Sequence, residues 1–191
     1  MLKLTYHGHS CWEFDDGTHR VLIDPFLTGN KLADVGPDTF TKLDAIIVSH
    51  GHGDHIGGGR QFPFGHVKLT IAHHGSTGPD GEALGNPAGI VLSMGGKKVY
   101  HAGDTALFLD MKLIAEMNGP FDAGLLPIGD NFTMGITDAA KAAEFVNASV
   151  AIPMHYDTFG WIEADPNEFV KRVEAGGRKA VVVKPGASYS V

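Results

Sequence analysis

Short apolar runs separated by turn-forming residues fill the first half of the chain, and segments with helical spacing follow in the second half. Runs rich in β-branched and aromatic residues predict strands. Strands are expected at Leu2–Tyr6, Ser10–Phe14, Arg20–Ile23, Ala45–Ser49, Lys68–Ala72, Gly89–Ser93 and Lys97–His101. The run at Ala45–Ser49 ("AIIVS") is continuously apolar, which is typical of a strand buried on both faces.

Apolar residues recur at helical spacing in three later segments. Helices are expected at Leu107–Met117, at Asp138–Val146 with Thr137 as N-cap, and from Asp165-Pro166 to about Glu174. Further strands are expected at Ala123–Pro127, Val150–Pro153 and Ala180–Val183. Strands first and strand–helix units later predict a layered α/β fold. With 191 residues, we expect a single domain over residues 1–191.

Composition and charge narrow the class of protein. The chain is 43% hydrophobic and 19% charged, which is typical of a globular domain. Its formal net charge of −7, without any Lys/Arg run, disfavours a nucleic-acid surface built on phosphate neutralisation. No apolar stretch is long enough to span a membrane and no signal-peptide pattern opens the chain. We therefore expect a cytoplasmic protein with neither a membrane nor a nucleic-acid partner, and the single Cys11 leaves no internal disulfide.

The segment "SHGHGDH", directly after the apolar strand, concentrates titratable side chains. It contains His50, His52, Asp54 and His55 within six residues. Neutral imidazole and carboxylate are donors that zinc and similar ions prefer, and the glycines between them let the backbone curl around one point. A loop of solvent-exposed histidines is the alternative, but His-x-His-x-Asp-His is far more specific than a bare His-x-His. The segment predicts a metal site, with two ions.

Four other predicted strands also end in histidine or aspartate. The motifs are "HHGS", "HAGDT", "IGDN" and "MHYD". Because α/β folds place their sites at strand ends, we expect these side chains to meet the histidine-rich loop.

Together these motifs resemble the metallo-β-lactamase superfamily. More narrowly, "YHGHSCWEF", "IDPFLTGN", "SHGHGDHIG", "YHAGDTALF", "LPIGDNFTMG" and "PMHYDTF" are similar to a family of largely uncharacterised metal-dependent hydrolases akin to ascorbate-6-phosphate lactonase-like proteins. The resemblance runs nearly from end to end and implies a four-layer αββα sandwich. One departure is that only "IGGGRQFPFGHV" separates His55 from Lys68, where relatives usually carry a few dozen more residues. The fold is thus expected with a shortened segment after the His-x-His-x-Asp-His motif.

The resemblance also implies a ligand set. It assigns His50, His52 and His74 to one ion, Asp54, His55 and His155 to the other, and Asp104 as the bridging carboxylate. His73 is the alternative to His74. Asp24 matches a residue that supports the ligand loop through hydrogen bonds without binding metal. Three protein ligands per ion, beside the shared bridge, leave a position for water, as catalytic sites do.

This ligand set predicts a dinuclear metal-dependent hydrolase. A metal-bridging hydroxide would attack an ester, lactone or phosphodiester of a small-molecule substrate. Zinc is favoured, although manganese, nickel or iron can occupy the same donors. Asp54 is expected to accept a proton from the nucleophile, and His101 either protonates the leaving group or is a buried polar residue of the core. The shortened segment leaves an open cleft or one covered by a partner subunit, so a homo-oligomer is a further hypothesis.

Three other functions compete with this prediction. They are a nuclease of the RNase Z type, an iron-dependent oxidative enzyme and a non-catalytic metal-binding module. The acidic balance disfavours the nuclease. Among the remaining residues, His7 and His9 are expected to be pocket or supporting groups, and Asp130 and Asn131 either line the pocket or form a turn.

Overall fold

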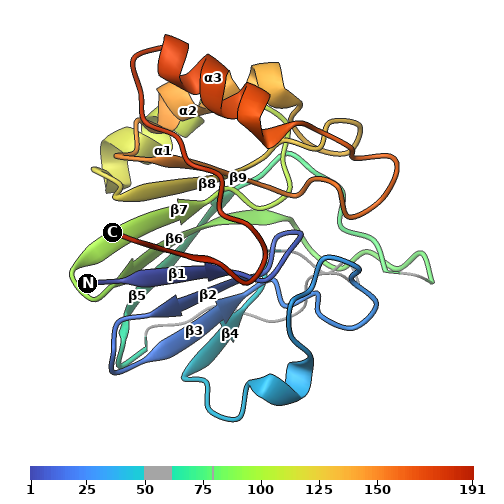
Figure 1. The fold of residues 1–191 in the computed structure, drawn as a ribbon, viewed down its shortest axis with the longest axis vertical. Helices are drawn as coiled ribbons and strands as arrows, with labels where there is room; N and C mark the ends of the chain where they lie inside the picture. The colour runs from blue at the N-terminus through green and yellow to red at the C-terminus, as the bar shows by residue number, and fades with distance from the viewer. Residues whose placement is uncertain (50–61, 79) are drawn as a thin grey trace.

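The computed structural model describes residues 1–49, 62–78 and 80–191, which form two stacked sheets with the α-helices on one side (Figure 1). The first sheet has the order β10-β1-β2-β3-β4, and the second has the order β5-β6-β7-β8-β9. The first sheet contains β1 (Lys3–Tyr6), β2 (Trp12–Asp15), β3 (Arg20–Ile23), β4 (Ala45–Ile47) and β10 (Ser188–Ser190). The second contains β5 (Gly65–Ile71), β6 (Ala88–Met94), β7 (Lys97–His101), β8 (Ala123–Pro127) and β9 (Ala151–Met154).

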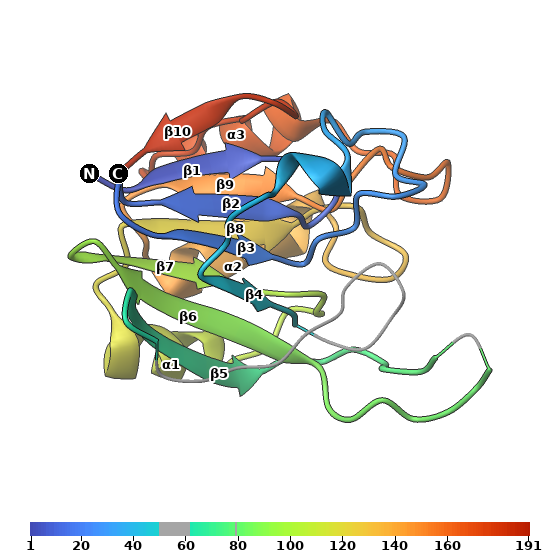
Figure 2. The ribbon, with the colours of Figure 1, turned by 90° about the horizontal axis from the view of Figure 1, so that it is seen from below.

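Each sheet combines antiparallel hairpins with parallel pairs. In the first sheet β3 and β4 are parallel, and in the second β7, β8 and β9 are parallel. Parallel strands end at the same edge of a sheet, and the ends of β4, β7, β8 and β9 lie at one end of the sandwich (Figure 2). β10 pairs with β1, which places the two ends of the chain side by side (Figure 2).

Two apolar cores hold the layers together. Trp12 and Phe14 of the first sheet meet Ile90, Leu125 and Ile152 of the second in the core between the sheets. A second core lies between the second sheet and the helices α1 (Met111–Asn118), α2 (Ile136–Val146) and α3 (Pro166–Ala175). On the outer face of the first sheet, the segment 24–44, with the short 3₁₀ turn η1 (Pro37–Thr39), forms the remaining layer. No helix among the described residues is long and apolar enough to cross a membrane.

Most predicted elements are present, with differences at their ends. The bounds of β3, β7 and β8 agree with the prediction, and the predicted cap of α3 is confirmed, since Asp165 Oδ1 accepts the Asn167 backbone N–H at 2.9 Å. The predicted start of the first helix at Leu107 is wrong, because α1 begins at Met111. Thr137 is not an N-cap either, since α2 begins at Ile136 after Gly135.

The predicted strand at Ala180–Val183 is wrong. Only Ala180 makes a bridge, to Ala151, and the chain then leaves the second sheet. Val183 is buried in the core between the sheets. The apolar run therefore belongs to a segment that passes between the two sheets without forming a strand.

Candidate metal centre

Three predicted ligands converge at the end of the second sheet where its parallel strands finish. His74 follows β5, Asp104 follows β7 and His155 follows β9. Asp104 Oδ2 lies 3.0 Å from His155 Nε2 and 3.8 Å from His74 Nε2. The Asp104 side chain is only 3% exposed. One buried carboxylate oxygen thus faces two imidazole nitrogens, and this donor chemistry fits a divalent transition-metal ion.

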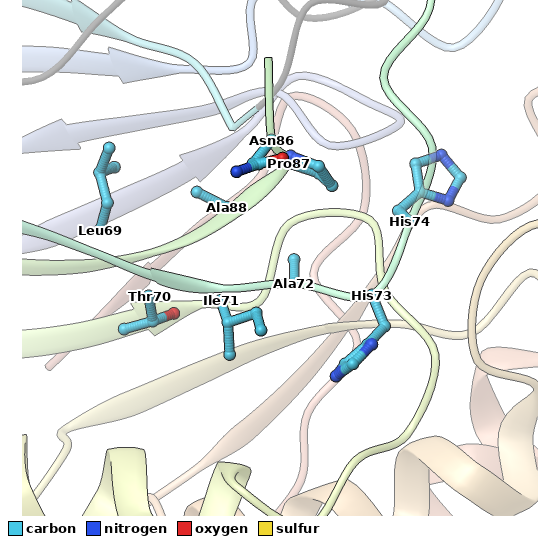
Figure 3. Close-up of a pocket in the computed structure, with 9 residues that line it drawn as sticks. All are labelled: Leu69, Thr70, Ile71, Ala72, His73, His74, Asn86, Pro87 and Ala88. Atoms are coloured by element: carbon cyan, nitrogen blue, oxygen red, sulfur yellow. The ribbon is translucent and has the colours of Figure 1, made fainter.

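The two adjacent histidines after β5 take different directions (Figure 3). The ring of His73 packs edge-on against Phe108, with ring centroids 4.9 Å apart, and His73 is exposed. His74 is partly buried and faces Asp104. This placement supports His74 over His73 as the ligand.

The other four predicted ligands, His50, His52, Asp54 and His55, lie outside the described residues, and so does the proton-accepting role assigned to Asp54. Within residues 1–49, 62–78 and 80–191, no three His, Cys, Asp or Glu side chains are arranged to hold an ion by themselves. The residues around Asp104 therefore form part of a centre that requires further donors.

The end of β4, just before those four residues, is fixed against the centre. Asp24 is fully buried, and its Oδ1 accepts the backbone N–H of Ser49 at 2.7 Å. This is a hydrogen bond of the kind implied by the resemblance. Gly103 has φ +64°, and a Cβ there would lie 2.5 Å from the Ala88 carbonyl oxygen and 3.1 Å from Ser49 Cβ. Only glycine allows the loop of Asp104 to approach Ser49 so closely.

His155 is held by residues of the first sheet. Its backbone has φ +54°, and its N–H donates to the His9 carbonyl at 2.8 Å. The Tyr6 hydroxyl donates to the same carbonyl at 2.8 Å. Burial raises the pKa of Tyr6 well above its ordinary value, so the phenol stays protonated and keeps donating. The His9 and His155 rings lie 4.1 Å apart, which supports the predicted supporting role of His9, whereas the sequence pattern gave no indication of Tyr6.

His101 is buried and engaged on both sides of its ring. Nδ1 accepts the Gly103 backbone N–H at 3.1 Å, and Nε2 lies 3.1 Å from the Ser10 carbonyl oxygen. Because Nδ1 is an acceptor, Nε2 carries the proton and donates it to Ser10. This geometry favours the core alternative for His101 over leaving-group protonation.

Two loops beside the centre are tied together by Thr105, which the motif analysis missed. Its hydroxyl accepts the His73 backbone N–H at 3.0 Å, and its carbonyl accepts that of Met134 at 3.0 Å. Asp130 and Asn131 are exposed and have φ +59° and +55°, and Asp130 Oδ1 accepts the Asn131 N–H. These two residues fit the turn alternative. The sequence signal that could have identified Thr105 was its position directly after Asp104 in "HAGDT".

Comparison with known proteins decides the family. A model described as a beta-lactamase superfamily domain matches residues 3–155. The chain belongs to the metallo-β-lactamase superfamily. The UPF0173 metal-dependent hydrolase of Bacillus velezensis is 43% identical over 221 residues, covering 94% of this chain and 96% of the relative. YtkL of Bacillus subtilis, named likewise, is 43% identical over 223 residues, covering 95% and 97%.

A solved structure gives the same answer. Igni18, described as a novel metallo hydrolase from the archaeon Ignicoccus hospitalis, has a TM-score of 0.85 at 32% identity, covering 100% of this chain and 99% of that chain. The predicted family and fold class are confirmed, and the chain is a metal-dependent hydrolase. The match with the Bacillus velezensis relative spans 30 more positions than the 191 residues present here, so that relative has at least 30 residues without a counterpart. Their expected place, between His55 and Lys68, stays a prediction.

A cavity of about 650 Å³ adjoins the centre of this hydrolase at His74 (Figure 3). It lies between the end of β5 and the start of β6. It is lined by Leu69, Thr70, Ile71, Ala72, His73, His74, Asn86, Pro87 and Ala88. Its size falls within the range of small-molecule sites.

His7 belongs to a separate ionic cluster. Its Nδ1 lies 2.8 Å from Asp34 Oδ1 and its Nε2 lies 3.3 Å from Glu13 Oε2. Burial by itself lowers the pKa of His7, but hydrogen bonds to Glu13 and Asp34, with the charges of both carboxylates, outweigh it and raise this pKa. The hydrogen bond from His7, together with Arg20, lowers the pKa of Glu13 against the opposing effect of burial.

Proposed function

We propose that this metal-dependent hydrolase is dinuclear and acts on an ester, lactone or phosphodiester of a small molecule. The observation that carries the proposal is the position of Asp104 Oδ2 between His74 and His155. A carboxylate shared by two ions has to lie between the imidazoles of both sites, and these two histidines come from different sites of the implied ligand set. Two divalent ions, with zinc favoured, would supply an activated water at neutral pH and a Lewis acid for the developing oxyanion.

Each residue has a proposed role. The first ion would be held by His50, His52 and His74, and the second by Asp54, His55 and His155, with Asp104 shared. Asp54 is also proposed as the acceptor of the proton that the nucleophile releases.

Three residues would support these ligands without binding metal. Asp24 orients the start of the ligand loop through Ser49, and the His9 carbonyl fixes the backbone of His155. His101 is proposed as a positioning residue that holds the Gly103–Asp104 turn, because both its ring nitrogens are engaged with backbone groups.

The first test is the metal content of protein purified without added metal, measured by inductively coupled plasma mass spectrometry. We expect about two equivalents of transition metal. Asp104→Asn should reduce this to below one equivalent and lower turnover of the best ester, lactone or phosphodiester at least about 100-fold. Asp138→Asn, an exposed carboxylate on α2, is the matched control and should keep both ions.

The same measurement separates the competing functions. One equivalent or less in metal-replete native protein would contradict the dinuclear proposal. Two equivalents without turnover on any of the three substrate classes would indicate a non-catalytic binding module. Bound iron together with oxygen consumption would indicate oxidative chemistry.

A further inference from the structure

We propose that the cavity beside His74 receives an apolar, uncharged arm of the substrate, so that the hydrolase prefers substrates with a medium-length alkyl chain. The inference rests on the proposed function, because it places the reacting group at the centre formed by His74, Asp104 and His155. It adds a substrate class to that function.

The first observation is that, among the described residues, the sandwich leaves side chains of β5 only partly covered. Leu69 pairs with Ile90 and Ile71 pairs with Ala88 across the β5–β6 ladder. Directly paired residues share a face of the sheet, and Ile90 lies in the core between the sheets. Leu69 and Ile71 therefore face the interior side, yet they are 51% and 53% exposed. Apolar side chains on an inward face that remain half-exposed favour an apolar ligand.

The second observation is that this open face continues to the metal centre. Leu69 and Ile71 line the cavity of about 650 Å³, together with Ala72, Pro87 and Ala88, and His74 lines the same cavity. Figure 3 shows His74 at one end of this row and Leu69 at the other. A substrate whose reacting group lies at His74 can thus extend its remaining part along β5.

The third observation is the chemistry of the walls. Among the described residues that line the cavity, none has a carboxylate, ammonium or guanidinium group. This contrasts with a chain of net charge −7. Thr70, Asn86 and the two histidines add a hydroxyl, an amide and imidazoles to walls whose other side chains are apolar, which is the composition of a small-molecule site. A charged arm would find no carboxylate, ammonium or guanidinium partner there, whereas an alkyl chain would cover Leu69 and Ile71.

The test compares 4-nitrophenyl acetate, butyrate and octanoate as substrates of the zinc-loaded protein. We expect kcat/KM for the octanoate ester to exceed that for the acetate ester at least about tenfold, because several methylene groups are transferred from water into the cavity. Ile71→Asp should reduce this octanoate-to-acetate ratio at least about fivefold by placing a charge beside the chain. Leu109→Asp is the matched control, because Leu109 is 67% exposed ahead of α1 and should keep the native ratio.

A binding measurement separates this inference from the proposed function. In saturation-transfer NMR, octanoate should receive transfer from the protein, acetate should not, and Ile71→Asp should abolish the octanoate signal. Octanoate binding without turnover of any ester would sustain the cavity assignment and contradict ester hydrolysis. Equal turnover of the three esters, with no octanoate binding, would overturn the assignment and leave the hydrolase intact. A dimer by light scattering that Ile71→Asp dissociates would also overturn it, since a second copy would then cover the cavity.

Discussion

The position of Asp104 depends on the glycine that precedes it. Gly103 has a left-handed backbone, and a Cβ there would meet both Ala88 and Ser49, so its lack of a side chain sets the distance between the loop of Asp104 and the end of β4. Gly96, in the turn between β6 and β7, is also left-handed (φ +74°) but has open space around its Cβ position. Both glycines have a left-handed backbone, but only Gly103 has neighbouring atoms close to the position that a Cβ would occupy.

This difference predicts unequal effects of the same substitution. An alanine at either position costs about 1–2 kcal/mol for its left-handed backbone. Gly103→Ala should destabilise the protein by about 2 kcal/mol more than Gly96→Ala, because its methyl group would overlap a backbone oxygen. Urea denaturation measures both, and metal analysis should show loss of metal in Gly103→Ala alone. Equal destabilisation of the two variants would show that the close approach is unimportant.

At the level of single residues, the sequence identifies candidate metal ligands more readily than the residues that hold those ligands in place. His74, Asp104 and His155 could be selected because their types and motifs are specific to metal ligands. Gly103 and Thr105 act through contacts with residues distant in the chain. Tyr6 acts on the distant His155 indirectly, through the His9 carbonyl that both residues bind. No local sequence pattern indicates these long-range contacts. The structure is needed to find them.

Among the elements, the His7 cluster connects the turn before β2 to the segment 24–44. His7 precedes that turn, Glu13 lies on β2 and Asp34 lies in the outer segment. Because the raised pKa of His7 means that the folded state binds its proton more tightly, protonated His7 stabilises the fold. This stabilisation is fully present below the ordinary pKa of 6.5 and is lost as the pH rises through the raised value.

We therefore expect His7→Gln to flatten the dependence of stability on pH. At pH 6 the substitution should cost about 1–3 kcal/mol, since it leaves the buried Glu13 Oε2 without its charged partner. Above pH 6.5 the native protein should lose free energy of unfolding with increasing pH, and the variant should not. Denaturation at four pH values from 5.5 to 8.5 measures this, with His66→Gln on exposed β5 as control. An unchanged slope in His7→Gln would contradict the role of the cluster.

The prediction of strands failed where the apolar pattern of a segment does not match its backbone hydrogen bonding. Ala180–Val183 looks like a strand because it is apolar, but Val183 is buried and Val181 half-buried in the core between the sheets, and only Ala180 makes a bridge. β10 escaped prediction because "SYS" is short and mostly exposed, and only its pairing with β1 makes it a strand. Central strands such as β8 were predictable because burial on both faces leaves a continuous apolar run.

On the scale of the whole molecule, burial is uneven across the second sheet. All residues of β8 and β9 are buried, whereas β5 at the edge has exposed or half-buried residues throughout. The architecture itself was predictable, since the motifs at strand ends resemble one family from end to end. The half-exposed side chains of β5 were not, because their exposure depends on which inward-facing residues the other described elements leave uncovered.

Hydrogen exchange should follow this gradient. We expect backbone amides of β8 to exchange at least about 100-fold more slowly than those of β5, because β8 is buried and paired on both sides, whereas β5 is an exposed edge strand that opens locally without global unfolding. Mass spectrometry on peptides from each strand measures the rates. Protection of β5 equal to that of β8 in the monomer would contradict the open-edge description.

The pairing of β1 with β10 has a consequence for engineering. The backbone N–H of Leu2 donates to the Val191 carbonyl at 3.2 Å, and the N–H of Val191 donates to the Leu2 carbonyl at 3.1 Å. A short glycine-rich linker can therefore join the two ends without moving either strand. New termini opened at Gly96, in the turn between β6 and β7, would give a circularly permuted enzyme in which the strand order changes along the chain but every residue around Asp104 keeps its place in space.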